Sequence, residues 1–285
     1  MKGQVAAVRV LLDSGADKDA ADQDGWRPLH WAAAKGQVGV LTTLLKRSAD
    51  KEAADETGLR PLHIAAVGGH LAAVRALLDS GAEKDAADGR GRRPLHLAAL
   101  TGQETAVRAL LDSGADKEAA EEQGVRPLHL AALTGQVAAL RALLDSGADK
   151  GAADGSGGTP LEYAAMRGQV EALRALLEGG CRATVAADGG RAVGIALKKG
   201  QHAAAELLMA EGAATGYGSA EHWAAFAQWQ RGRVAQLVAE REAAEAAREA
   251  ERAELRALFV AIAAEARRQA GAGRPAKRRR RAAAP

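Results

Sequence analysis

The sequence predicts an all-α solenoid, a stack of repeated helix pairs followed by a long C-terminal helix and a disordered basic tail. A string of the type Arg-Pro-Leu-His begins at Arg27 and returns every 33 residues, at Arg60, Arg93 and Arg126. A fifth, altered copy begins at Thr159, at the same interval. Aromatic residues make up only 3% of the chain, so the core must consist of Ala, Leu and Val, which suits thin, closely packed layers. A constant period of this length indicates a structural unit that stacks on its neighbours.

Each unit is expected to form a turn, a short helix and a longer helix. In residues 57–89, Pro61 fits a first helical turn, where its missing N–H costs nothing. The second helix carries apolar residues at helical spacing, and Gly81 stands where a left-handed C-cap is usual. One such unit cannot bury its apolar face alone, whereas stacked neighbours can, and this explains why the string recurs.

The pattern resembles the ankyrin repeat family. The resemblance rests on the 33-residue period, the Pro-Leu-His-x-Ala-Ala string, a glycine in mid-repeat and a following Leu-Leu…Gly-Ala-Asp, and it covers residues 1 to about 215. It implies a curved stack of helix pairs with hairpin loops projecting at right angles. It also implies a non-catalytic scaffold that binds other proteins.

The chain divides into five segments on this basis. Residues 1–23 hold a partial repeat, 24–187 five repeats, 188–232 degenerate repeats without the Pro-His signature, 233–270 a long helix rich in charge and alanine, and 271–285 the basic tail. The partial repeat begins at its second helix. Two interpretations of that start stay open: a capping helix, or a native protein that is longer at this end.

Four of the five repeats depart from the family at the first residue of the string. The resemblance implies a threonine there, which caps the first helix and bonds the motif histidine, and only Thr159 keeps it. Loss of a capping hydroxyl costs roughly 0.5–2 kcal/mol per site. We therefore expect the arginine-containing repeats to be less stable than repeats that keep threonine.

Composition and charge exclude several classes of protein. The single cysteine, Cys181, allows no intrachain disulfide and favours a reducing compartment, the cytoplasm or the nucleus. No run approaches the ~18 apolar residues of a membrane span, and no signal peptide is evident. The net charge is +3, but residues 271–285 alone carry +6, so the rest of the chain is at −3 and no basic nucleic-acid groove is expected along the stack.

Four histidines occupy one position in successive repeats and raise the question of a metal site. Stacked helices lie ~8–10 Å apart, whereas zinc requires ligand nitrogens at about 2.0–2.1 Å from one ion. We therefore expect each imidazole to bond loop backbone instead. The sequence shows no phosphate-binding glycine loop and no pairing of nucleophile and base, so neither an enzyme nor a cofactor is expected. The four are His30, His63, His96 and His129.

The positions that the family leaves free are the candidate partner-binding residues. The resemblance implies that the residue after each tip glycine, and the residues after each Ala-Ala pair, line a concave groove. We expect an exposed apolar column there. The alternative, in which these side chains merely pack on one another along the stack, stays open. The candidates are Trp26, Leu59, Arg92, Val125, Val67, Leu100, Leu133, Met166 and Arg167.

Two features near the C-terminus predict further contacts. Leu255, Leu258, Phe259 and Ile262 share one helix face, which must bury against the stack, a partner or a second copy in weak self-association. The stripe lasts under two heptads, short for a stable coiled coil. The basic run has three interpretations: a nuclear-import signal, a contact with nucleic acid or another polyanion, or an inert tail. It consists of Lys277, Arg278, Arg279, Arg280 and Arg281.

The sequence as a whole therefore predicts a scaffold that binds an unidentified protein through the groove and hairpin tips. One alternative is a nuclear or nucleic-acid-associated factor that uses the basic tail, although nucleic-acid binding is the less expected of the two. Another is a fragment of a larger protein whose upstream domain carries the activity. The sequence does not identify the partner, because one fold serves many functions.

Overall fold

The computed structural model describes residues 2–181 and 190–215, and between 224 and 250 a set of residues that includes 238–250. The chain forms two units, Met1–Trp223 and Ala224–Pro285, which are described separately. The apolar stripe at 255–262 and the basic run at 277–281 lie outside the described residues.

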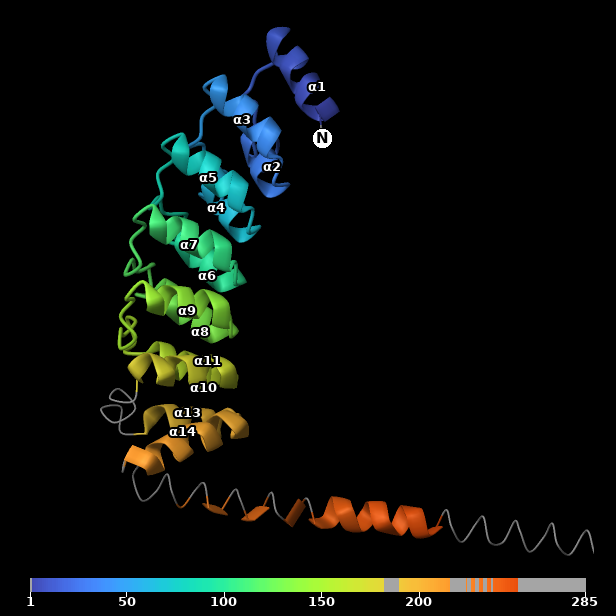
Figure 1. The fold of residues 1–285 in the computed structure, drawn as a ribbon, viewed down its shortest axis with the longest axis vertical. Coiled ribbons are helices and arrows are strands. Elements are labelled where there is room, and N and C mark those ends of the chain that lie inside the picture. Colours follow the sequence, from blue (N-terminus) through green and yellow to red (C-terminus); the bar gives the residue numbers. More distant parts are fainter. Residues whose placement is uncertain are drawn as a thin grey trace, which may run out of the picture. The chain divides into compact units, whose positions relative to one another are not determined.

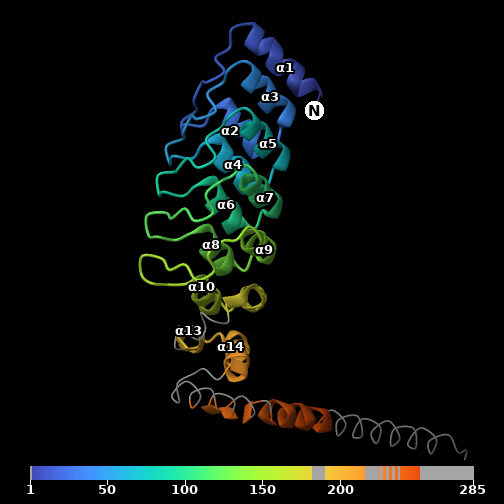
Figure 2. The same cartoon turned by 60° about the vertical axis from the view of Figure 1, so that its left-hand side comes forward.

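The first unit is a stack of helix pairs, and its described residues contain helices and turns but no strand (Figure 1). Figure 2 shows the first helices in one column, the second helices in another, and long loops that project beyond the first helices. The helices are α1 (Lys2–Asp13), the pairs α2 (Pro28–Ala34) and α3 (Val38–Lys46), α4 (Pro61–Val67) and α5 (Leu71–Asp79), α6 (Pro94–Thr101) and α7 (Glu104–Asp112), α8 (Pro127–Thr134) and α9 (Val137–Asp145), α10 (Pro160–Arg167) and α11 (Val170–Leu176), a π-helical turn η1 (Leu177–Cys181), and the pair α13 (Arg191–Lys198) and α14 (His202–Thr215).

The core is a repeating layer of leucine and alanine. Leu62 on α4 and Leu77 on α5 are at most 2% exposed, and Ala65 and Ala66 are fully buried. The same positions are buried in the following repeats. Because alanine is small, the first helices of neighbouring repeats approach closely and need no aromatic side chain to fill the layer.

In four consecutive repeats, a buried histidine ties the first helix to the loop of the next repeat. His96 Nδ1 accepts the backbone N–H of Arg93 at 3.1 Å, and its Nε2 donates to the carbonyl of Val125 at 3.1 Å. These bonds occupy both ring nitrogens, and they confirm the expected backbone-bonding role. The other members of the column make the same pair of bonds, and all are fully buried: His30, His63 and His129.

The arginines in the capping position act across repeats. A guanidinium has no acceptor and cannot replace the threonine hydroxyl. Instead, Arg93 Nη1 lies 3.5 Å from Asp85 in the loop before it and 3.1 Å from Asp116 in the loop after α7. The same oxygen of Asp85, Oδ1, accepts the backbone N–H of Asp116 at 2.9 Å. The side-chain cap is absent at these four sites, as expected, and each arginine instead contributes ion pairs to the join between repeats. The lower stability of these repeats stays a prediction. The other bridges are Arg27 with Asp50, Arg60 with Glu52 and Glu83, and Arg126 with Glu118 and Asp149.

In the fifth repeat, both the capping-position arginine and one of its acidic partners are replaced. Thr159 Oγ1 accepts the backbone N–H of Glu162 at 3.4 Å, the cap that the other repeats lack. Gly151 stands where the earlier repeats carry the acid of the preceding loop, so the arginine and its acidic partner are absent from the same repeat. The side chain of Glu162, in the histidine position, meets Arg191 of the next helix pair at 3.2 Å.

The loop tips also stack on one another. Asp55 Oδ1 accepts the N–H groups of Thr57 and Leu59 at 2.8 and 2.9 Å and so closes the turn. Gly58 has φ +84°, and a Cβ there would lie 2.5 Å from the nitrogen of Gly89 in the next tip. Only glycine fits both requirements. Gly89 donates to the carbonyl of Thr57 at 2.9 Å, which links consecutive tips.

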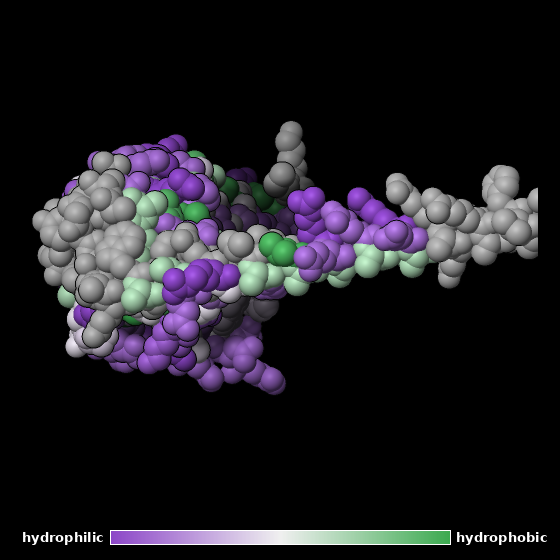
Figure 3. Space-filling view, turned by 90° about the horizontal axis from the view of Figure 1, so that it is seen from below, coloured by the Kyte–Doolittle hydropathy of each residue, from purple (hydrophilic) through white to green (hydrophobic). Residues whose placement is uncertain are grey.

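In the second unit, residues 238–250 form a helix in which every residue is exposed. Figure 3 shows hydrophilic residues along one side of this helix and hydrophobic ones along the other. Arg241 and Glu245 form an i,i+4 ion pair at 3.0 Å. Nowhere in the described part of the chain is a helix both long and apolar enough to cross a membrane.

The first prediction concerns the arginine bridges. In low salt, we expect the free energy of unfolding of Arg93→Thr to lie within about 1 kcal/mol of the wild-type value. The reason is that a cap of roughly 0.5–2 kcal/mol replaces two partly exposed ion pairs of roughly 0.2–1 kcal/mol each. In 1 M NaCl, where the Debye length is about 3 Å, the ion pairs are screened. The free energy of unfolding of the variant should therefore rise relative to that of the wild type. Urea unfolding at both salt concentrations measures this. Arg75→Thr is the control, since Arg75 forms no ion pair within the described residues. Equal salt dependence of the two variants would show that the bridges contribute nothing.

The second prediction concerns pH. Burial disfavours the charged imidazole and lowers the pKa of His96 to about 4, and it also lowers the pKa values of the other three buried histidines. Below pH ~6.5 the unfolded chain takes up protons that the folded chain resists, so stability should fall as the pH drops from ~6.5 toward 4. At 1.36 kcal/mol per pKa unit, His96 alone accounts for a loss on the order of 3 kcal/mol. We expect a shallower fall for His96→Gln, measured by urea unfolding at several pH values. A slope that matches the wild type would contradict this assignment.

Candidate partner-binding surface

An apolar strip follows the first helices from α4 to α10. We use "apolar strip" for Val67, Leu100, Leu133 and Met166, which occupy the same position in the first helices of four consecutive repeats. Val67 is 38% exposed, and the other three are partly exposed. Most large apolar side chains of these repeats are buried, so the strip remains available after the stack has formed.

Hydrogen bonds hold neighbouring first helices at the edge of the strip. Thr134 Oγ1 donates to the carbonyl of Leu130 at 2.8 Å within α8, and it also lies 3.1 Å from the carbonyl of Leu100 on α6. Thr101 bonds the carbonyl of Leu97 at 2.9 Å. These bonds fix the spacing of the apolar side chains, and Arg167 continues the threonine column as an exposed cation on α10.

The residues after the tip glycines have different environments. Leu59 and Trp26 are partly exposed. Arg92 is held by Asp88, whose Oδ2 lies 2.9 Å from Nε and 2.8 Å from Nη2, and this neutralises the arginine. Val125 is only 6% exposed. The expectation that Val125 presents a partner-binding surface is therefore wrong, because its side chain belongs to the core beneath the tip.

A second column on the first helices was missed from the sequence. It lies three residues before the apolar strip, on the same helix face, and the i,i+3 spacing is the signal that could have found it. Its exposure varies: Trp31 is 49% exposed, whereas Ile64 and Leu97 are 8% and 4% exposed. Leu130 and Tyr163 are partly exposed and complete the column.

Aromatic side chains bond loop carboxylates at both ends of this column. Trp31 Nε1 donates to Asp22 at 3.0 Å, and the hydroxyl of Tyr163 donates to Asp154 at 2.6 Å, in each case across nine residues. Burial would raise the pKa of Asp154, but hydrogen bonds from Tyr163, Ser156 and Gly158 outweigh that effect and lower the pKa to about 2. The carboxylate therefore stays ionised, and these contacts fix both aromatic rings.

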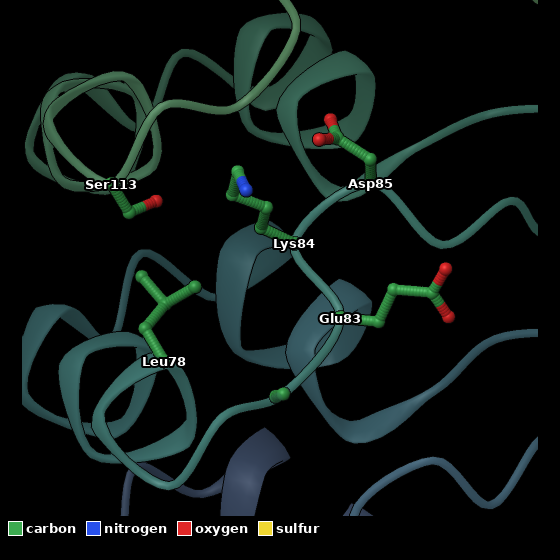
Figure 4. A pocket seen from close by; sticks show the side chains of 6 residues that line it. Leu78, Glu83, Lys84, Asp85 and Ser113 are labelled. Atoms are coloured by element: carbon green, nitrogen blue, oxygen red, sulfur yellow. The ribbon is translucent and has the colours of Figure 1, made fainter.

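A hollow of about 440 Å³ lies elsewhere, between the end of α5 and the following loop (Figure 4). It opens beside Lys84, which extends into it near Ser113. Lys51 and Lys117, at equivalent positions, bond the carbonyls of Ser80 and Ser146, whereas Lys84 makes no such bond among the described residues. The hollow follows from one side-chain position and brings no reactive groups together. Across the described residues, no group of His, Cys, Asp or Glu could hold a metal ion.

Comparison with known proteins agrees with this geometry. The family model for ankyrin repeats, in three copies, matches residues 1–88, 62–154 and 128–219. A search of curated proteins finds no match to this chain. Ankyrin repeats are generally protein–protein interaction modules and generally have no enzymatic activity. With its matches spanning most of the sequence, this chain belongs to the ankyrin repeat family.

Proposed function

We propose that this chain is a non-catalytic scaffold that binds a protein partner through the concave face of the stack. The contact surface consists of the apolar strip, with Trp26, Leu59 and Arg92 on the loop side and Arg167 at one end. The observation that carries the proposal is the exposure of the strip in a stack whose other large apolar residues are mostly buried. An exposed apolar row of this kind is stabilised when a partner covers it.

Variation among the repeats supports the same surface. Positions that stack the repeats are nearly constant, such as the buried Leu and the Ala-Ala pair of each first helix. The position after the tip glycine instead changes from Trp26 to Leu59 and Arg92. Packing alone would accept one residue type at every tip. The differences give each repeat its own contact, which a specific partner requires.

The third prediction tests the apolar strip. Affinity capture with the wild-type chain should yield a protein that is lost with the double variant Leu100→Glu, Leu133→Glu. With that protein purified, we expect the variant to bind at least about 30-fold more weakly in calorimetry, the effect of losing a hot spot worth 2 kcal/mol or more. Charge in the strip leaves the buried leucine layer intact, so the variant should keep the wild-type circular dichroism.

A matched control is Arg75→Glu on α5, an exposed residue of the second-helix column. It introduces the same charge outside the proposed surface and should leave affinity unchanged. If the strip variant and the control bind equally well, the strip is not the contact surface. A partner lost with both variants would point to non-specific charge effects.

We further propose weak self-association through Leu255, Leu258, Phe259 and Ile262. The proposal rests on the sequence, in which four large apolar residues share one helix face.

The fourth prediction tests self-association. Sedimentation of the full chain should show a mass that rises with concentration, and the double variant Leu258→Asp, Ile262→Asp should sediment as a monomer because charge on the stripe opposes its burial. Monomeric sedimentation of the wild type at every concentration would reject this role of the stripe.

A further inference from the structure

We propose that Trp26 and Trp31, with the carboxylates around them, form a subsite for a cationic side chain, an arginine or lysine of the partner. This inference rests on the proposed function and specifies the chemistry of one end of the contact surface. Every residue that it uses lies within the stack and is described by the structure.

The two indoles contact each other at an angle, and we call this pair the wedge. Their ring centroids are 4.8 Å apart, and their planes are inclined by 57°. Trp31 is 49% exposed and Trp26 is partly exposed, so ring surface faces solvent. A cation within about 6 Å of an indole centroid is attracted by the negative face of the ring, and indole is the best of the aromatic side chains for this.

Hydrogen bonds hold both rings in place and strengthen their negative faces. Trp31 Nε1 donates to Asp22 Oδ2 at 3.0 Å, and Trp26 Nε1 donates to Asp55 Oδ2 at 3.1 Å. Each carboxylate also accepts backbone N–H groups of its own loop. The rings therefore need no rearrangement to receive a cation, and this limits the entropic cost of binding.

The charge around the wedge is negative. Asp24 and Glu56 are exposed at the adjacent loop tips, in addition to Asp22 and Asp55. The nearby arginine, Arg27, is engaged with Asp50 at 3.2 Å. Lys35, at the C-cap of α2, is a cation about one helical turn beyond Trp31. Four carboxylates against these cations favour a positively charged ligand.

None of the other four repeats between residues 24 and 187 has this arrangement. The position of Trp26 is taken by Leu59, Arg92, Val125 and Gly158 in the later repeats. Within the five repeats at residues 24–187, the position of Trp31 is aromatic again only at Tyr163, whose neighbour at the tip is Gly158. The repeats at residues 57–187 stack without such a pair, so stacking does not require it. We infer that it serves recognition at this end of the surface.

The experiment uses the full chain and a cation that offers no hydrogen-bond donor. Tetramethylammonium chloride is titrated against the ¹⁵N-labelled protein at constant ionic strength, and the indole N–H signals of Trp26 and Trp31 are followed by NMR. We expect saturable shifts of both signals. Trp31→Phe should weaken binding by about 2- to 30-fold, the range of a cation–π contact, and Trp31→Leu should abolish it. The matched control, Tyr163→Leu at the other end of the column, should leave the titration unchanged.

The neutral analogue 2-methylpropan-2-ol, which has the same number of heavy atoms as tetramethylammonium, separates charge from apolar contact. Equal shifts with the alcohol would overturn the proposal, because the wedge would then be an apolar surface only. Absence of saturable shifts with tetramethylammonium would overturn it as well. The double variant Leu100→Glu, Leu133→Glu should still bind tetramethylammonium, so failure of the cation subsite and failure of the apolar strip are distinguishable results.

Discussion

Each helix pair in this protein can bury its apolar face only against the next pair. The contact between pairs therefore determines how the loops and first helices are arranged. The leucine and alanine layer supplies the non-directional part of that contact. The buried histidine supplies the directional part, because its two bonds connect the start of a first helix to the loop of the following repeat. A repeat displaced along or around the stack would lose these bonds while keeping much of the apolar contact. Histidine therefore fixes the geometry in which the loops and first helices present their outer side chains.

The arginine bridges show that one structural requirement can be met in two ways. Thr159 satisfies a backbone N–H of its own helix. Arg93 instead joins the acids of two consecutive loops, and its contact is therefore between repeats rather than within one. The hydroxyl cap stabilises a helix whatever its neighbours are, whereas the bridge operates only when repeats are correctly stacked. Replacing caps by bridges moves part of the stability from single repeats to their interfaces and makes the stack more cooperative and more sensitive to salt.

Most of the fold could be predicted from the sequence because neighbouring residues define each repeat and the same pattern returns many times. Proline positions give the starts of the first helices, and the buried histidines have the role that stacking distances require. The arginine contacts could not be predicted, since Arg93 meets Asp116 across 23 residues, which local patterns do not reveal. The burial of Val125 and the exposure of Trp31 could not be predicted from the sequence either. Both depend on how far each side chain extends from a loop tip or helix, not on its place in the repeat.

The repeats differ mainly in their surface residues, because their interior is nearly uniform. Stacking keeps the buried positions nearly constant, so a partner distinguishes the repeats mainly through side chains that stacking leaves free. The apolar strip varies in size but not in character, from Val67 to Met166. The loop tips vary in character, from the Trp26 and Trp31 pair at one end to Gly158 at the other. A partner that places a cation at the indoles and apolar side chains along the strip would meet these features in one orientation only, because reversing it would set the cation near Arg167.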